Sequence, residues 1–229
     1  MKLVTASLLT AHKQGGKAMQ THIAFILDMS GSMAAVESAT REGAVGYFRI
    51  LKTDTPDARV NLTIFDTVVE HWITDQAASE MKVKTTLAKW QPRGGTALYD
   101  AVGETVKALA EKVGKDDKAI VTVMTDGQEN SSVKWDRKKL NKLVNRLTKQ
   151  GNWTFVYMGA NVDAWDESGK LGFAKGNTMA YSSSPGSTRA AMHSHTHATV
   201  ALAHSGLTST SGIYKDADLD QDVRDEDDK

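Results

Sequence analysis

A run of apolar residues ends in oxygen-bearing side chains in the stretch FILDMSGSM, residues 25–33. Asp28 closes the run, and Ser30 and Ser32 follow at every second position around Gly31. A carboxylate and two hydroxyls at this spacing suit a phosphate site, a site for a hard cation, or a simple turn. Other parts of the chain distinguish among these three.

Two more oxygen-bearing side chains stand in later loops, Thr96 in RGGTALYD and Asp126 in MTDGQEN. None of these motifs contains a histidine or a cysteine, and hydroxyl and carboxylate oxygens are ligands that hard divalent cations prefer. The glycines of the same loops, which supply flexible backbone, are Gly31, Gly94, Gly95 and Gly127. The pattern indicates a site for Mg²⁺, or alternatively Mn²⁺ or Ca²⁺. Its candidate ligands are Asp28, Ser30, Ser32, Thr96 and Asp126.

Strand and helix patterns alternate along the chain from residue 21 onward. Short apolar or alternating runs predict strands at residues 22–27, 59–65, 68–73, 118–126 and 152–160. Helical spacing predicts helices at residues 33–51, 97–113, 135–149, 163–169 and 188–204. This alternation predicts an α/β fold, a doubly wound and mostly parallel Rossmann-like sheet with helices on both faces and one antiparallel edge strand. Ligands of such sheets bind beyond the carboxyl ends of the strands, where Asp28 and Asp126 stand.

The order D-x-S-x-S, then Thr96, then Asp126 resembles the metal-ion-dependent adhesion site of von Willebrand factor A domains, which integrin inserted domains also carry. The resemblance spans about residues 21–204. The segments FILDMSGSM, PRGGTALYDAV, VMTDGQENSS and FVYMGANVDAW are similar to an intracellular bacterial and phage branch of that family.

The resemblance implies a role for each candidate ligand. Ser30 and Ser32 would bind the ion through their hydroxyls, and Thr96 would bind it directly or through water. Asp28 and Asp126 would neutralise charge, mainly through water or by holding the serines. The sixth position would be left to water or to an Asp or Glu carboxylate of a protein partner, because few direct anionic ligands leave the cation under-neutralised. The family therefore implies a protein-binding module and not an enzyme.

Other interpretations of the same residues stay open at this point. Asp28, Ser30 and Ser32 alone fit an Asx turn with helix capping, and an ion could merely stiffen the loops. A phosphohydrolase with a nucleophilic Asp would need a second Asp two residues later as general acid, and Ser30 stands there instead. A phosphate-binding glycine loop and a Ser-His-Asp triad are not evident in the sequence.

Several other motifs favour ordinary structural explanations. His193, His197 and His204 fall on one helical stripe, and the first two have a spacing that zinc sites use, but a solvated helix face is the simpler explanation. Asp216, Asp218 and Asp220 have the spacing of a calcium loop without its turn glycine. Asn161 and Asp163 are expected to cap a helix, and core packing is expected for the remaining apolar candidates, Met29, Met33 and Trp165.

The composition of the chain limits which kinds of site, partner and location can be expected. The 229 residues contain no cysteine, so disulfides and thiolate metal sites are excluded, and 28 basic residues balance 28 acidic ones, which gives no reason to expect nucleic-acid binding. No apolar run approaches the ~20 residues of a membrane helix, and the N-terminus makes a poor signal peptide. We expect no membrane association and a cytoplasmic protein, or one in the virion or host cytoplasm if a phage encodes it.

The two ends of the chain are expected to be appendages to a domain at residues 21–204. Residues 1–20 would form a flexible extension, and Met19 could be the true start. Residues 205–215, rich in Ser, Thr and Gly, predict a flexible linker. Residues 216–229 hold eight acids and two bases and predict a disordered acidic tail that competes weakly for the metal site or aids solubility.

Overall fold

The central sheet of this protein carries six strands in the order β3-β2-β1-β4-β5-β6. The computed structural model describes residues 19–160 and 164–216. The strands are β1 (Thr21–Asp28), β2 (Arg59–Phe65), β3 (Val69–Ala77), β4 (Lys118–Thr125), β5 (Trp153–Ala160) and β6 (Thr178–Tyr181). All neighbouring pairs are parallel except β2 and β3, so β3 is an antiparallel edge strand. The predicted doubly wound α/β class is therefore confirmed.

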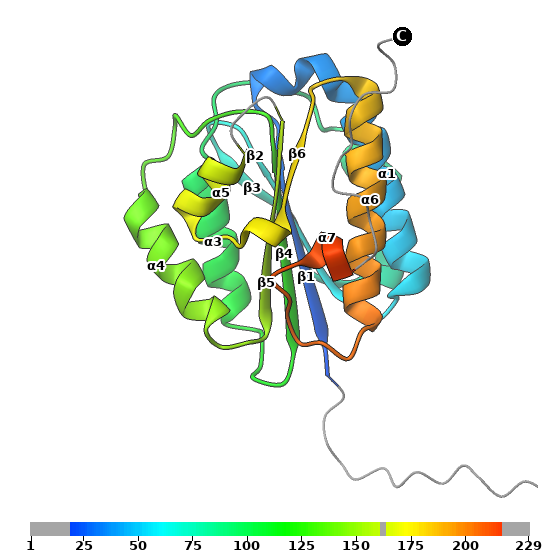
Figure 1. Ribbon diagram of the computed structural model, residues 1–229. Helices are drawn as coiled ribbons and strands as arrows, with labels where there is room; N and C mark the ends of the chain where they lie inside the picture. The colour runs from blue at the N-terminus through cyan, green and yellow to red at the C-terminus, as the bar shows by residue number, and fades with distance from the viewer. Residues whose placement is uncertain (1–18, 161–163, 217–229) are drawn as a thin grey trace, which may run out of the picture.

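Helices cover both faces of this sheet (Figure 1). The longer helices are α1 (Glu37–Asp54), α3 (Leu98–Ala110), α4 (Arg137–Thr148), α5 (Ala164–Leu171) and α6 (Pro185–His204). The short helices are α2 (Val83–Leu87) and α7 (Ile213–Asp216), with 3-10 turns η1 (Gly31–Val36), η2 (Ala78–Glu80) and η3 (Lys175–Asn177). Helices α1 and α6 pack on one face, and α3, α4 and α5 pack on the other.

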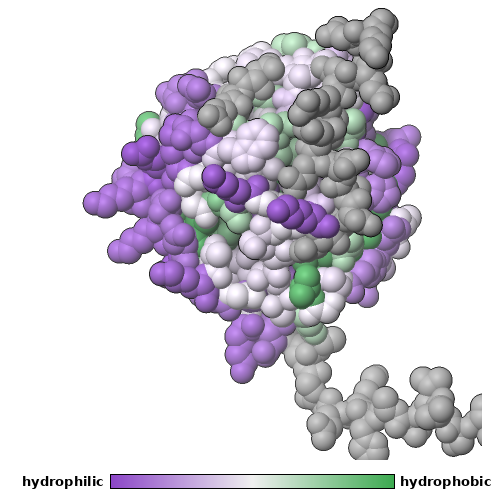
Figure 2. Space-filling model, viewed as in Figure 1, coloured by the Kyte–Doolittle hydropathy of each residue, from purple (hydrophilic) through white to green (hydrophobic). Residues whose placement is uncertain are grey.

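Successive side chains of each strand point to opposite faces of the sheet, so each face forms its own hydrophobic core with the helices packed against it. On β1, Phe25 and Leu27 face the α1 and α6 side, whereas Ala24 and Ile26 face the α3 side, and all four are fully buried. Helix α4 is amphipathic in the same sense, since its leucines are buried and its lysines and arginines face solvent. Figure 2 shows hydrophilic side chains gathered over this side of the molecule.

Several element boundaries differ from the sequence prediction, and one strand was not predicted. Helix α6 begins at Pro185 and not at residue 188, because the Ser184 side chain caps it by accepting a hydrogen bond from Ser187 N and proline suits the first turn. The first predicted helix starts as a 3-10 turn and continues to Asp54. Strand β6 was not predicted, since four residues are too short to show a strand pattern.

The predicted flexible linker at residues 205–215 is wrong, because this segment packs on the sheet and carries α7. Ser209 Oγ donates to Gly151 O over 2.9 Å, and Ile213 N donates to Asn177 Oδ1 over 2.8 Å. The side chains of Ile213 and Tyr214 are only 1% and 2% exposed. The packed chain therefore extends past residue 204 to residue 216.

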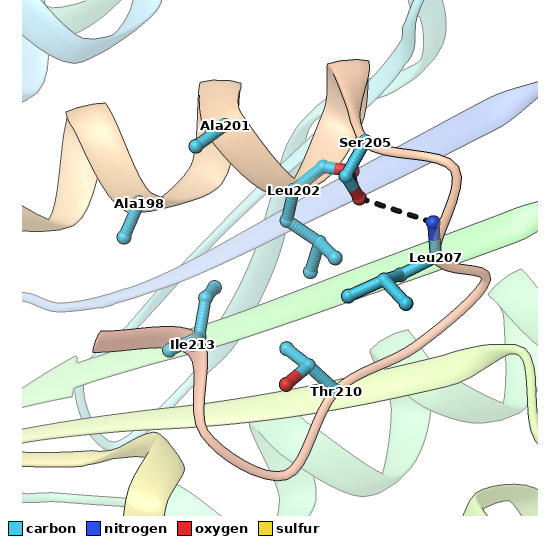
Figure 3. Close-up of a pocket in the computed structure, with 7 residues that line it drawn as sticks. All are labelled: Ala198, Ala201, Leu202, Ser205, Leu207, Thr210 and Ile213. Carbon is cyan, nitrogen blue, oxygen red and sulfur yellow. Dashed lines mark hydrogen bonds between the residues drawn. The ribbon is translucent and has the colours of Figure 1, made fainter. Parts of the chain in front are cut away.

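The contact between this segment and the body of the protein is close. A Cβ on Gly176 would lie 2.4 Å from Ser211 O, so only glycine allows this approach. Figure 3 shows Leu202, Leu207 and Ile213 around a cavity of about 70 Å³, with Leu207 N donating to Ser205 Oγ over 3.2 Å.

Lys118, the first residue of β4, connects the sheet to the end of α6. Its side chain is fully buried, and its Nζ donates to the carbonyl oxygens of Leu202, Ala203 and Ser205 over 2.5, 3.3 and 3.0 Å. The last carbonyls of a helix have no partner within the helix. The ammonium group satisfies these carbonyls and offsets the negative end of the helix dipole.

Ile213→Val is expected to lower the free energy of unfolding by about 0.5–1.5 kcal/mol, because it removes one buried methylene group. Leu207→Val is the matched control, since Leu207 is 49% exposed and surface changes usually stay within about 0.5 kcal/mol. Urea unfolding of both variants measures the difference. Equal stability of the two variants would contradict the packing of α7 on the core.

Candidate metal centre

Asp28 lies at the carboxyl end of β1, where the chain leaves the sheet. Its side chain is fully buried. Oδ1 accepts a hydrogen bond from Ser30 N over 2.6 Å, and Oδ2 accepts one from Thr125 Oγ1 over 2.5 Å. The carboxylate therefore fixes the loop after β1 to the end of β4, which is the neighbouring strand.

A chain of side-chain oxygens links Ser30, Ser32 and Asp126 next to Asp28. The Oγ atoms of Ser30 and Ser32 are 3.1 Å apart, and Ser32 Oγ donates to Asp126 Oδ1 over 2.5 Å. Ser30 is buried, Asp126 is half-buried and Ser32 is exposed. The chain thus runs from the protein interior to solvent.

Thr96 reaches the same place from the loop before α3. A Cβ on Gly127 would lie 3.0 Å from Thr96 Oγ1 and 3.5 Å from Ser32 Oγ. Gly127 therefore leaves open the space between these two hydroxyls, which a larger residue would fill. Thr96 N donates to Asn130 Oδ1 over 2.8 Å, and Thr96 O accepts from the backbone N–H groups of Asn130 and Ser131.

Electrostatics at the cluster favour a bound cation. Burial raises the pKa of Asp28 to about 6, against the hydrogen bonds from Thr125 and Ser30, and the nearby Asp126 adds to the shift. Burial also raises the pKa of Asp126, against the hydrogen bond from Ser32. Two carboxylates held in a partly dry site are destabilised as anions, and a cation between them would relieve this.

An outer ring of contacts holds the three loops together. Met29 O accepts from Arg93 N over 2.7 Å, and Gly31 N donates to Gly94 O over 3.2 Å. Gly94 has φ of 66°, and a Cβ there would lie 2.8 Å from Thr67 Oγ1, so glycine is required. Arg93 Nε donates to Asp66 Oδ2 over 2.5 Å, which fixes the loop after β2.

The structure brings all five predicted ligands to one edge of the sheet, in three loops. Sequence reasoning missed Thr125 and Arg93, although both lie within the quoted motifs, MTDGQEN and RGGTALYD. Thr125 directly precedes Asp126, and a hydroxyl at the end of a buried strand could have signalled a bond to a neighbouring strand end. Arg93 offered no such signal, because its partner Asp66 is 27 residues away.

Of the apolar candidates of the sequence, Met29 and Met33 are core residues, 2% and 0% exposed, and Trp165 is 48% exposed. Asn161, Asp163, Asp218 and Asp220 lie outside the described residues, as does the Asp216 side chain. Within the described ranges, no three or more His, Cys, Asp or Glu side chains are placed together to hold a metal ion. The donors of this cluster are three hydroxyls with two carboxylates.

Residues 23–128 match the family model of the von Willebrand factor type A domain. Solved structures with the same fold include a von Willebrand factor type A protein from Catenulispora acidiphila (TM-score 0.60, 16% identity), the PilB minor pilin from Streptococcus sanguinis (0.59, 11%) and the pilus adhesin SpaC from Lactobacillus rhamnosus GG (0.63, 13%). The fold is that of a von Willebrand factor A domain.

The A-domain fold accounts for most of this chain and a smaller part of those proteins. The matches cover 80%, 80% and 82% of this chain, but 43%, 61% and 31% of the respective relatives. No curated protein matches the sequence. None of the helices in the described ranges has the length and apolar composition that crossing a membrane requires.

Proposed function

We propose that the protein is a divalent-cation-dependent, protein-binding A domain and not an enzyme. The observation that carries the proposal is the chain of oxygens from Ser30 through Ser32 to Asp126, with Thr96 across the space that Gly127 leaves open. Hydroxyl and carboxylate oxygens at one point suit a hard ion. The motif sequences also favour the intracellular bacterial and phage branch, and hence the cytoplasm or a virion as its location.

The donor set fits Mg²⁺, with Mn²⁺ or Ca²⁺ as alternatives. Ser30, Ser32 and Thr96 would hold the ion through their hydroxyls, and Asp28 and Asp126 would neutralise its charge from behind. A cation bound mainly by neutral oxygens retains attraction for an outside carboxylate. Because Ser32 is exposed at the edge of the cluster, an Asp or Glu of a protein partner can approach from solvent.

Experiments can distinguish this proposal from two alternative functions. The ion could serve only to stabilise the loops, or the site could belong to a phosphohydrolase-like enzyme. The first differs from the proposal in partner capture alone. The second has less support, because Ser30 occupies the position where such an enzyme needs a general acid.

Thr96→Ala is expected to weaken the stabilisation by Mg²⁺ and to reduce capture of an acidic partner. The alanine removes one hydroxyl donor, so less ion is bound to the folded state, and mass action predicts a smaller rise in melting temperature. The measurement is thermal unfolding with EDTA or with millimolar MgCl₂, together with capture from host lysate under both conditions. Thr53→Ala is the control, since Thr53 is exposed near the far end of α1.

The outcomes separate the alternatives. Loss of capture in Thr96→Ala, with EDTA-state stability equal to wild type, supports cation-dependent binding. Normal capture in EDTA together with a normal Mg²⁺ response of stability would leave only the stiffening role. Identical melting curves of the wild type in EDTA and Mg²⁺ would remove the metal site altogether.

A further inference from the structure

Helix α6 presents a pair of histidines to solvent on the side away from the sheet. His193 and His197 are both exposed, and their Nε2 atoms are 3.1 Å apart. Their ring centroids are 4.4 Å apart with an interplanar angle of 62°. Residues four apart on a helix lie on the same face, and here this spacing has brought two imidazole nitrogens to one point.

We propose that His193 and His197 form a second metal site, which takes a borderline transition cation such as Zn²⁺, Cu²⁺ or Ni²⁺. Neutral imidazole nitrogen is a preferred ligand of these ions, whereas the all-oxygen cluster suits harder ones. Two nitrogens each about 2.0–2.1 Å from one tetrahedral Zn²⁺ lie about 3.3–3.4 Å apart. The observed separation of 3.1 Å therefore needs an adjustment of only a few tenths of an ångström.

The helix holds the pair in a fixed position. The opposite face of α6 is buried, and a Cβ on Gly43 of α1 would lie 2.8 Å from Met192 Cγ, so the two helices are in close contact. Ser184 caps the N-terminus of α6 and Lys118 binds its last carbonyls. An ion would therefore have to order only two side chains, which keeps the entropy cost of binding small.

The charged residues and the other histidines near the pair neither repel an ion strongly nor compete for it. Arg189 lies one turn before His193, and its Nε pairs with Glu42 over 3.2 Å, which offsets its positive charge. His204 lies seven residues after His197, about 10 Å further along the axis, so it cannot complete the site. His195 is fully buried, with Nε2 at 2.9 Å from Thr122 Oγ1. The remaining coordination positions are open to water or to an outside ligand.

The simpler explanation is a hydrogen bond between two neutral imidazoles. The two explanations make different predictions for added metal, since protons and cations compete for the same nitrogen lone pairs. A hydrogen-bonded pair that is not a metal site would show no specific uptake of Zn²⁺ or Cu²⁺ above that of the other exposed histidines.

Calorimetric titration of the full chain with ZnCl₂, in saturating MgCl₂ to block the oxygen cluster, tests the proposal. The wild type is expected to bind one Zn²⁺ tightly, and His193→Gln and His197→Gln are each expected to weaken that binding by at least about tenfold, since loss of one of two ligands commonly removes more than 1.4 kcal/mol. The matched control is His204→Gln, because His204 is exposed on the same helix but lies beyond reach of the pair, and it should leave the affinity within about twofold of wild type.

Paramagnetic resonance with CuCl₂ gives an independent readout. The wild-type spectrum should show coupling to two imidazole nitrogens, and each single variant should show one. Because both side chains are exposed, the unfolding midpoints of the metal-free variants should match that of the wild type. Unchanged Zn²⁺ affinity in both variants, or an equal loss in His204→Gln, would overturn the site.

Discussion

Asp28→Asn is expected to abolish the stabilisation of the protein by Mg²⁺ without lowering its stability in EDTA. Burial raises the pKa of Asp28 to about 6 from its usual value of 3.8. At neutral pH the folded state therefore carries the anion at a cost of roughly 3 kcal/mol. The neutral amide avoids this cost, but it cannot neutralise a cation behind Ser30 and Ser32.

The asparagine also fits the existing contacts. Its side-chain oxygen can accept the bond that Ser30 N donates to Asp28 Oδ1, and its amino group can donate to Thr125 Oγ1. That hydroxyl is 3.2 Å from Gly127 O and can donate there instead. In EDTA the variant should thus be at least as stable as the wild type. With the ion at about 100 times its dissociation constant, only the wild type should gain about 2.7 kcal/mol.

Denaturant unfolding in EDTA and in MgCl₂ measures both effects. Asp116→Asn is the matched control, because its side chain is 79% exposed and lies away from the cluster. It should keep the full Mg²⁺ response. An Asp28→Asn protein that retains the Mg²⁺ response would show that the carboxylate does not neutralise the ion, and a large loss of stability in EDTA would show that it serves mainly to hold the loops.

Lys118→Met is expected to lower the free energy of unfolding by about 3–5 kcal/mol. The substitution keeps much of the buried aliphatic volume but removes an ammonium group that donates to three carbonyls at the end of α6. Leu202 O would keep the hydrogen bond that Ser205 Oγ donates over 2.9 Å, whereas the partly buried carbonyls of Ala203 and Ser205 would lose the ammonium donor. Burial lowers the pKa of Lys118, so the buried ammonium group is held at a desolvation cost.

Lys115→Met provides the comparison for this variant, since the Lys115 side chain is 91% exposed and lies only three residues earlier. It should unfold within about 0.5 kcal/mol of the wild type. Hydrogen exchange adds a local readout, because the Lys118→Met variant should lose protection first in the last turn of α6 and in residues 205–216. Equal stability of the two methionine variants would mean that water can replace the ammonium group.

The sequence was most informative where patterns are local. The apolar runs that become β1 and β4 predict buried strands directly, and the position of Asp28 and Asp126 at the ends of those runs places them at one edge of a parallel sheet. The antiparallel partner of β2 follows from the short connection between two strand-like runs. These features depend on spacing alone, which a sequence displays.

Features that depend on distant partners could not be predicted. Residues 205–215 have the composition of a linker, and only the contacts of Ile213 with Asn177 and the core show that they are packed. From the sequence alone, Lys118 is indistinguishable from an ordinary charged residue at the start of a strand, because its partner Leu202 is 84 residues away. His195 is surrounded by exposed histidines in the sequence, yet it alone points into the core and stacks on Tyr47.

The pairing of β1 with β4 also bears on how the chain is made by a ribosome. Asp28 and its partner Thr125 are separated by 97 residues. At a synthesis rate of 5–20 residues per second, the second half of the cluster emerges about 5–20 s after the first. During that interval β1 lacks its neighbour β4 on one side, although β2, itself paired with β3, can already pair with its other side. The nascent chain therefore carries an open strand edge beside an incomplete oxygen cluster, and this is the stage at which a chaperone would have most to protect.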